Sequence, residues 1–383
     1  MSHQNSTATV FVTGGTGFLG SHVIHQLLQP QGADAKPRYH VRASARDVAK
    51  LERIFPQQVS DKSLEVVQIP DLVKSDHRPY LKGVDALIHC ASSIPGDPSI
   101  SVKDLFEASY KGAVNVVEQA IEVGVKKIVV TGTAGSLFPV DMKEAFDPNT
   151  KIDETAYNPI NSADELDPKL FDEPTDAADA FQKQMYVYMI GKALSDKKIW
   201  EIANRKENEE VDVSMILPPD IFGEYVPNYP YPKSLAARSS LGTNDHVYYL
   251  LTGGPHGPNT YPPIQIGHEV DVKDAAKAHI RALDAPPVYV DKKRRNKRFI
   301  VCGSQFTWKE AAEIIRRARP ELASRLPIDG EGEGHVSPAQ TCMKFDASFT
   351  KDVLGMDKYV PFEETLLGAV DVCLEFERRV NGS

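Results

Sequence analysis

The 383-residue chain has few cysteines, no excess of basic residues and no long apolar run. Its four cysteines never form a CxxC pair, so neither a zinc site nor a disulfide framework is indicated, and a reducing compartment is expected. Lys and Arg number 44 against 53 Asp and Glu, and this acidic balance argues against a nucleic-acid partner. No window approaches the roughly 18 apolar residues that a membrane span needs.

The N-terminal segment offers no targeting signal. Its first apolar run, residues 9–13, leads directly into a glycine turn, which leaves no room for the three parts of a signal peptide. We therefore expect a cytoplasmic protein with no membrane partner, acting on small molecules as a monomer or a homodimer.

Short β-rich runs alternate with longer helical patterns through the first two hundred residues, which predicts βαβ units and a parallel sheet. Each expected strand is a continuous apolar run, as in strands that helices cover on both faces. We expect a Rossmann-type, doubly wound α/β fold with a smaller C-terminal α/β substrate-binding lobe. The expected strands are residues 9–13, 39–43, 65–69, 86–89, 127–131, 212–217 and 298–302, and the expected helices are 19–28, 108–123, 185–205, 307–318 and 362–380.

Two stretches break this rhythm: residues 139–182 are dense in Asp, Glu, Pro and Asn, and residues 218–263 in Pro, Gly and Tyr. Long loops in a compact domain usually cover a site, so both are candidate lids over the carboxyl edge of the sheet. For residues 139–182 a tolerated acidic surface insertion is an equal alternative. The basic run at 292–298 is interpreted as a solvated turn.

A glycine-rich segment, TGGTGFLG, follows the first expected strand and opens the first helix. Gly14 permits the turn, Gly17 lets the backbone approach a pyrophosphate at the helix N-terminus, and Gly20 lets the helix pack tightly on its strand. A glycine loop between a strand and a helix predicts a dinucleotide site. The residues expected to form it are Gly14, Thr16, Gly17, Phe18, Leu19 and Gly20.

The end of the second strand favours NADP(H) over NAD(H). An NAD site usually has an acidic residue about 20 residues after the glycines, whereas an NADP site has an arginine for the 2′-phosphate. Here no acid ends the strand, and Arg46, with Lys50 one helical turn further on, offers charge-assisted contacts. Arg42 is a second candidate, and the alternative for Arg46 is a surface pair with Asp47.

Tyr188 and Lys192 stand four residues apart, on one face of an expected helix. A neighbouring ammonium stabilises a phenolate and lowers the pKa of a tyrosine from its usual value near 10. Tyr188 would then give a proton to a carbonyl oxygen as hydride arrives at the carbon. Two other Tyr-x-x-x-Lys matches, beginning at residues 229 and 289, follow or contain prolines that argue against a helix.

A hydroxyl group for the substrate oxygen is expected at the end of the fifth strand. Thr133 is the candidate. Thr131 is the runner-up, although its interpretation as a β-branched strand residue is favoured. His89 is expected to pack at a strand end. No HExxH, GxSxG or P-loop pattern is present and the histidines lack ligand spacing, so no metal is expected.

These motifs resemble the extended short-chain dehydrogenases/reductases, and within them the dihydroflavonol reductases, cinnamoyl-CoA reductases and fungal carbonyl and methylglyoxal reductases. The likeness runs over most of the chain and includes residues 89–92, 217–219 and the segment HEVDVKDAAKAH at 268–279. It implies that Thr133, Tyr188 and Lys192 form a catalytic triad, with Lys192 also bonding the nicotinamide ribose. The further cofactor-binding residues that it implies are Asp71, Leu72, Ala91, Ser92 and Pro218.

The resemblance implies an NADP-binding Rossmann domain over residues 1–217 and 264–302, and a substrate-binding lobe over 218–263 and 303–383. The expected reaction is the reversible NADPH-dependent reduction of an aldehyde or ketone. Two alternatives stay open: a nucleotide-sugar epimerase-type enzyme, and a catalytically silent NADP sensor. The sensor would be expected to have lost Tyr188 or Lys192. For the substrate itself, four aromatic residues either line an apolar pocket or pack within their loops, namely Phe138, Tyr225, Tyr229 and Tyr231.

Overall fold

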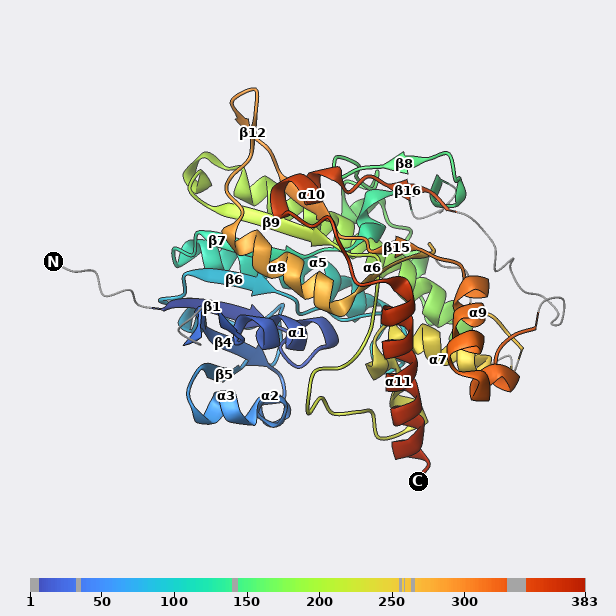
Figure 1. Ribbon diagram of the computed structural model, residues 1–383. Helices are drawn as coiled ribbons and strands as arrows, with labels where there is room; N and C mark the ends of the chain where they lie inside the picture. Colours follow the sequence, from blue (N-terminus) through green and yellow to red (C-terminus); the bar gives the residue numbers. More distant parts are fainter. Residues whose placement is uncertain are drawn as a thin grey trace.

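A seven-stranded parallel sheet lies at the centre of the molecule (Figure 1). The computed structural model describes residues 7–31, 36–139, 144–254, 257, 259–262, 266–328 and 342–382. The strand order is β14-β9-β7-β6-β1-β4-β5, and each neighbouring pair is parallel. The strands are β1 (Ala8–Thr13), β4 (Tyr39–Ala45), β5 (Leu64–Gln68), β6 (Ala86–His89), β7 (Lys127–Thr131), β9 (Asp212–Leu217) and β14 (Lys297–Ile300). All seven were predicted, and the Rossmann-type α/β class is confirmed.

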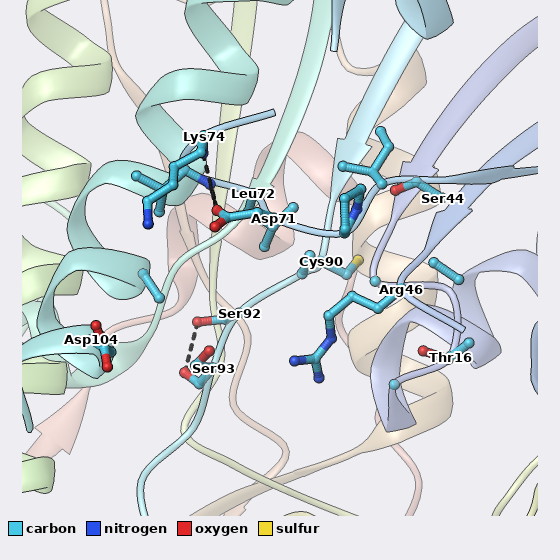
Figure 2. A pocket seen from close by; sticks show the side chains of 18 of the residues that line it. Thr16, Ser44, Arg46, Asp71, Leu72, Lys74, Cys90, Ser92, Ser93 and Asp104 are labelled. Atoms are coloured by element: carbon cyan, nitrogen blue, oxygen red, sulfur yellow. Dashed lines mark hydrogen bonds between the residues drawn. The ribbon is translucent and has the colours of Figure 1, made fainter. Parts of the chain in front are cut away.

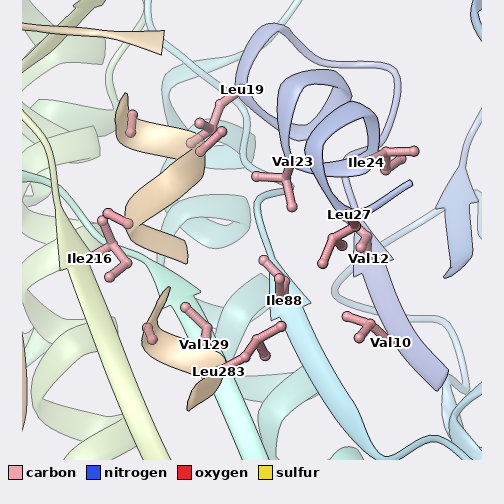
Figure 3. Packing of buried hydrophobic residues seen from close by; sticks show 14 of the residues in the cluster. Val10, Val12, Leu19, Val23, Ile24, Leu27, Ile88, Val129, Ile216 and Leu283 are labelled. Carbon is pink, nitrogen blue, oxygen red and sulfur yellow. The ribbon is translucent and has the colours of Figure 1, made fainter. Parts of the chain in front are cut away.

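Helices cover both faces of this sheet. Val10 and Val12 on β1 pack with one pair of helices (Figure 3), whereas Phe11 between them packs with the other pair. Because both faces are buried, the strands are apolar at consecutive positions, which is the pattern that the sequence shows. The first pair is α1 (Phe18–Leu27) and α8 (Val272–Asp284), and the second is α5 (Val102–Glu122) and α6 (Ala177–Ala203).

Several helices begin earlier than predicted or were missed, because their first turns are polar and show little apolar periodicity. The N-cap of α5 is Ser101, whose side chain accepts the Asp104 N–H, and that of α6 is Asp176. Such caps satisfy free N–H groups and fix where a helix begins. The helices that the prediction did not include are α2 (Val48–Ile54), α3 (Pro56–Ser60), α4 (Arg78–Leu81), α7 (Asn244–Thr252), α8 and α10 (Ser348–Leu354).

A second, smaller sheet begins where two strands of the main sheet end. Its strands are β10 (Asp220–Phe222), β11 (His268–Asp271) and β15 (Ser304–Gln305). Only two residues separate β9 from β10 and three separate β14 from β15, so this sheet lies at the carboxyl edge of the main one. Leu250, Ala312 and Val370 belong to its apolar core with other side chains of α7, α9 (Trp308–Ala318) and α11 (Phe362–Val380).

The basic run at 292–298 is not a solvated turn throughout, and the prediction was wrong for its last two residues. Lys297 and Arg298 lie in β14 and are each 1% exposed. Lys297 Nζ lies 2.7 Å from Asp212 Oδ2, and Arg298 Nη2 lies 2.6 Å from Asp196 Oδ2. Carboxylates distant in the sequence neutralise these cations, which is the condition for burying charge.

The described part of the acidic excursion, from residue 144, is anchored to the outside of α5 and α6. Arg298 Nη1 donates to the carbonyls of Glu154 and Ala156, each at 2.6 Å. Lys197 on α6 donates to the Asn158 carbonyl at 2.7 Å, and Leu166 packs with apolar residues of both helices. Its strand β8 (Lys151–Ile152) pairs with β16 (Lys344–Phe345). The excursion therefore braces α6.

None of the described helices combines the length and the apolar character needed to cross a membrane.

The remaining short elements lie at the periphery. The short strands and principal 3-10 turns are β2 (Pro30–Gln31), β3 (Lys36–Pro37), β12 (Tyr289–Val290), β13 (Lys293–Arg294), η1 (Ala134–Leu137), η2 (Glu144–Phe146), η3 (Ala163–Glu165), η4 (Pro168–Phe171), η5 (Lys206–Asn208), η6 (Leu235–Leu241) and η8 (Pro320–Arg325).

Candidate active site

The glycine-rich loop connects β1 to α1 at the carboxyl end of the sheet. Gly14 has φ +75°, which L side chains rarely adopt, and a Cβ there would lie 2.6 Å from the Ala91 nitrogen. Gly17 is the N-cap of α1, and its N–H donates to the Gly14 carbonyl at 2.9 Å. A Cβ at Gly20 would meet that same carbonyl oxygen, so this glycine lets α1 pack against the loop rather than, as predicted, against the strand.

A cavity of about 420 Å³ opens beside this loop. It lies where the strand order reverses between β1 and β6, the place at which dinucleotides bind in doubly wound sheets. Eight of the predicted cofactor residues line it, namely Gly14, Thr16, Gly17, Arg46, Asp71, Leu72, Ala91 and Ser92. The structure therefore brings together residues from four loops that the sequence separates widely.

Arg46 is an exposed cation of this cavity. Figure 2 shows its side chain extending into the space between Thr16 and Ser92, and no described carboxylate pairs with it. The alternative pair with Asp47 does not form, because Asp47 instead accepts the Lys50 N–H at 2.9 Å as the N-cap of α2. The second candidate, Arg42, points elsewhere and donates to a carboxylate of β5 at 2.6 Å.

Seven predicted cofactor residues do not line the cavity: Phe18, Leu19, Gly20, Lys50, Tyr188, Lys192 and Pro218. The Leu19 side chain is buried in the core, and the Phe18 ring lies edge-on to Tyr225 with centroids 5.5 Å apart. Lys50 Nζ lies 5.2 Å from the centroid of the Tyr229 ring. The prediction took Phe18, Leu19 and Gly20 in the first helical turn as contacts, but the two side chains there turn toward the core and toward Tyr225.

The four aromatic residues proposed for a substrate pocket pack instead. Phe138 and Tyr229 are buried, and the Tyr225 and Tyr229 rings lie 4.3 Å apart. The Tyr229 hydroxyl donates to the Thr16 carbonyl at 3.1 Å, which ties the 218–263 excursion to the glycine loop. Packing was the right alternative for these side chains.

Asp71 shapes the cavity wall next to β5 through its carboxylate, which binds the backbone that follows it. Its Oδ1 accepts the N–H groups of Val73 and Lys74, at 2.8 and 3.0 Å. Lys74 also lines the cavity, although the sequence analysis did not predict it (Figure 2). It lies three residues after Asp71 and is a second cation of the cavity. Further lining residues that the sequence analysis did not include are Ser44, Cys90, Ser93 and Asp104.

Lys192 lies behind the cavity, on α6. Its side chain is buried, and Nζ donates to the Thr131 carbonyl at the end of β7 at 2.8 Å. Burial lowers the pKa of Lys192 to about 8, an effect that Cys90 and Asp196 partly offset. Because Cys90 lines the cavity, the ammonium lies on the same side of the sheet edge as the glycine loop.

Tyr188 lies one helical turn before Lys192 and is half-buried. Burial, and secondarily the carboxylate of Asp220, raises the pKa of Tyr188 to about 12. The expected lowering by the ammonium is therefore not observed. The physical reason is that desolvation outweighs the attraction of a cation that the Thr131 carbonyl already binds.

A glycine between the two residues sets how closely α6 approaches α5. A Cβ at Gly191 would lie 2.8 Å from the Ser109 Cβ, so a larger residue would force the helices apart. Val187 and Ile190 on α6 pack with apolar residues of α5. This packing turns Tyr188 and Lys192 toward the end of the sheet. The small residue inside the Tyr-x-x-x-Lys pattern was the signal for this contact, and the sequence analysis did not use it.

Thr133 caps the 3-10 turn η1 next to α6. Its Oγ1 accepts the Gly135 N–H at 3.2 Å. A Cβ placed on Gly135 would lie 3.5 Å from both Thr133 Oγ1 and the Met189 side chain, so the hydroxyl faces the turn of α6 that carries Tyr188. Pro218 adjoins it, because its carbonyl accepts the N–H of the residue after Thr133 at 2.9 Å.

Thr131 and His89 have packing partners. Thr131 Oγ1 and His279 Nε2 lie 2.8 Å apart, so this hydroxyl is held below the sheet edge. His89 is buried, with Nδ1 2.8 Å from Thr13 Oγ1, and burial lowers the pKa of the imidazole to about 3. Thr133 is therefore better placed than Thr131 to meet a substrate.

Comparisons with known proteins point to reductases. The model of the 3-beta hydroxysteroid dehydrogenase/isomerase family matches residues 11–167. Ketoreductase sphI of Aspergillus fumigatus is 28% identical over 378 residues, which cover 96% of this chain and 98% of that protein. NADPH-dependent methylglyoxal reductase GRE2 of Saccharomyces cerevisiae is 23% identical over 384 residues, covering 97% and 100%.

A solved structure supports the same relationship. Gre2 from Candida albicans in complex with NADPH superposes with a TM-score of 0.73 at 25% identity, covering 96% of this chain and 99% of that one. The match spans both the glycine-loop half and the C-terminal half of the chain. The chain is similar to extended short-chain dehydrogenases/reductases, among them fungal Gre2-type reductases and ketoreductases.

Proposed function

We propose that this chain catalyses the reversible reduction of an aldehyde or ketone to an alcohol with NADPH. The observation that carries the proposal is the position of Lys192, one helical turn after Tyr188. Its ammonium binds the Thr131 carbonyl at the end of β7 and interacts with Cys90, which lines the cavity that holds the glycine loop and Arg46. The names of the relatives support it, since several are ketoreductases or NADPH-dependent reductases.

The residues present fit NADP(H). The glycine loop leaves room for a pyrophosphate at the N-terminus of α1, because side chains at Gly14 or Gly20 would collide with backbone there. Arg46 offers an unpaired guanidinium for a 2′-phosphate, and Asp71 and Leu72 form the adenine side. When bound, the nicotinamide supplies the hydride.

Three side chains would perform the proton chemistry. Thr133 Oγ1 would orient the substrate oxygen, and Lys192 would bond the ribose and stabilise the phenolate that Tyr188 leaves behind. As the carbonyl carbon gains hydride, its π bond breaks and the Tyr188 hydroxyl proton passes to the oxygen. The raised pKa of Tyr188 keeps that proton on the phenol at neutral pH, which suits a donor.

We further infer that residues 218–263 and 303–383 bind the substrate, and that residues 1–217 and 264–302 bind the cofactor. Support comes from the small sheet at the carboxyl edge and from the Tyr229 contact with the glycine loop. Residues 1–6 and the boundary at 263–265 lie outside the described part of the chain.

The direct test is consumption of NADPH with a panel of aldehydes and ketones, beside NADH with the same panel. We expect turnover with NADPH, a clear preference over NADH, and loss of turnover in Tyr188→Phe. Binding of NADPH without turnover of any carbonyl would instead support a sensor. Interconversion of a nucleotide sugar without net cofactor consumption would support an epimerase.

A further inference from the structure

An acidic residue stands at the catalytic end of the site, outside every motif of the sequence analysis. Asp220 begins β10, two residues after Pro218, whose carbonyl is held by the N–H next to Thr133. β10 pairs in parallel with β11, and Asp220 lies opposite Glu269 in that register. The chain thus carries this carboxyl from the end of β9 to the turn that holds Thr133.

The carboxyl group of Asp220 is half-buried, and no side chain or backbone N–H of the described residues donates to it. Buried carboxylates normally have such partners, as Glu269 does in the Ser304 hydroxyl, 2.6 Å away. Burial alone raises the pKa of Asp220 to about 7. A carboxyl group of this kind changes charge in the neutral range, close to the catalytic residues.

The charge of Asp220 acts on two titratable groups of the surrounding elements. On α6 the group is Tyr188, on which the Asp220 charge acts directly. On β11 it is Glu269, which is also acidic. Asp220 is not among the groups that shift the pKa of Lys192, which are Cys90 and Asp196. The charge of Asp220 therefore acts on the phenol from beside the turn that holds Thr133.

We propose that Asp220 is a further residue of the active site, which holds Tyr188 in its protonated form and thereby extends carbonyl reduction to higher pH while delaying alcohol oxidation. This inference rests on the proposed function. Asp220 is a positioning residue, since it acts through Tyr188 and not on the substrate. A carboxylate beside a phenol disfavours the phenolate, which is the form that must take a proton from an alcohol.

The test is the pH dependence of both directions in Asp220→Asn, which keeps the shape and removes the charge. In plots of turnover against pH, we expect the rising limb of alcohol oxidation and the falling limb of carbonyl reduction to move to lower pH by about one unit. At a fixed pH on the oxidation limb, turnover should then increase about tenfold. The matched control is Glu269→Gln, which removes a comparably buried acid opposite Asp220 and should leave both limbs in place.

Two results would overturn the proposal: limbs of Asp220→Asn that superimpose on those of the unmodified chain, or equal shifts in Asp220→Asn and Glu269→Gln. If Asp220→Asn does not fold, Asp220→Leu removes the same charge and must give the same shift.

A separate readout distinguishes this proposal from the proposed function. The absorbance of tyrosinate, titrated with pH and compared between the chain and its Tyr188→Phe variant, reports the ionisation of Tyr188 without turnover. We expect removal of the Asp220 charge to shift that titration to lower pH even if the panel of carbonyls were not reduced. An unchanged titration would contradict the role of Asp220 alone.

Discussion

The two ends of the candidate site differ in how completely the protein itself satisfies their charged groups. At the cofactor end, Arg46 is exposed and points into the cavity without a described partner. At the catalytic end, Lys192 is 6% exposed and donates to a backbone carbonyl. Arg46 at the cofactor end therefore needs an anion from a ligand. The fold itself holds Lys192 in place at the catalytic end.

This difference indicates that cofactor binding and catalysis depend on residues from separate parts of the chain. The cofactor end comes from loops after β1, β4, β5 and β6, and the catalytic end comes from α6, braced by Arg298 through Asp196. Substitutions at one end are therefore expected to leave the other largely intact.

The largest effect is expected at Lys192. In Lys192→Met the ammonium is lost while the stem is kept, and turnover should fall by about 10²- to 10⁴-fold because Tyr188 loses its stabilised phenolate. Lys192→Arg, which keeps a cation, should recover part of the activity. Steady-state kinetics with NADPH measure both, and turnover of Lys192→Met within tenfold of the unmodified chain would contradict the assignment.

Thr133 and Thr131 offer a matched pair at one strand end. Thr133→Ala should reduce turnover by about a hundredfold, because the substrate oxygen loses a positioned donor, whereas Thr133→Ser should retain most of it. Thr131→Ala should instead lower the melting temperature through the lost contact with His279, with little change in turnover. The reverse outcome would assign the catalytic hydroxyl to Thr131.

At the open end, Arg46→Ala should weaken NADPH binding by about ten- to a hundredfold and NADH binding little, since hydrogen bonds to charged groups contribute about 1.5–3 kcal/mol. Lys50→Ala is the control, because Lys50 lies over the Tyr229 ring outside the cavity. Fluorescence titration measures both cofactors. Equal losses of NADPH and NADH affinity in Arg46→Ala would contradict the assignment of Arg46 as the residue that binds the 2′-phosphate.

The smallest effect concerns stability at the small sheet. Burial raises the pKa of Glu269 from 4.5 to about 7, and its Oε2 has no partner among the described residues. Between these values the folded chain keeps a proton that the unfolded chain has released, so stability falls as pH rises through this window. Glu269→Gln should therefore stabilise the protein by about 1–2 kcal/mol at pH 8 and far less at pH 5. Thermal melting at both values tests this, and an equal gain at pH 5 would contradict it.

The sequence was sufficient for the parts of the molecule that depend on local pattern. Continuous apolar runs identified the seven strands, and the glycine loop identified the cofactor cavity, since both signals lie within one short segment. Arg46 was predicted correctly as a cavity residue because its strand end is itself a local feature.

What the sequence could not supply depends on residues that only the fold brings together. The burial of Arg298 requires Asp196, about a hundred positions away, and Tyr188 meets Asp220 only because β10 follows the end of β9. The direction of the Tyr188 pKa was wrong for the same reason. The Tyr-x-x-x-Lys spacing identified Lys192 as the cationic neighbour. It indicated neither how far Tyr188 is buried nor that the carboxyl group of Asp220 acts on it.

The most direct test of the central claim compares binding with turnover in one variant. Tyr188→Phe should bind NADPH within about threefold of the unmodified chain, because the cofactor end is untouched, and should lose turnover by at least about a hundredfold. Fluorescence titration and carbonyl reduction measured on the same preparation give both values. Turnover within tenfold of the unmodified chain, at equal NADPH affinity, would contradict the role of Tyr188 as proton donor.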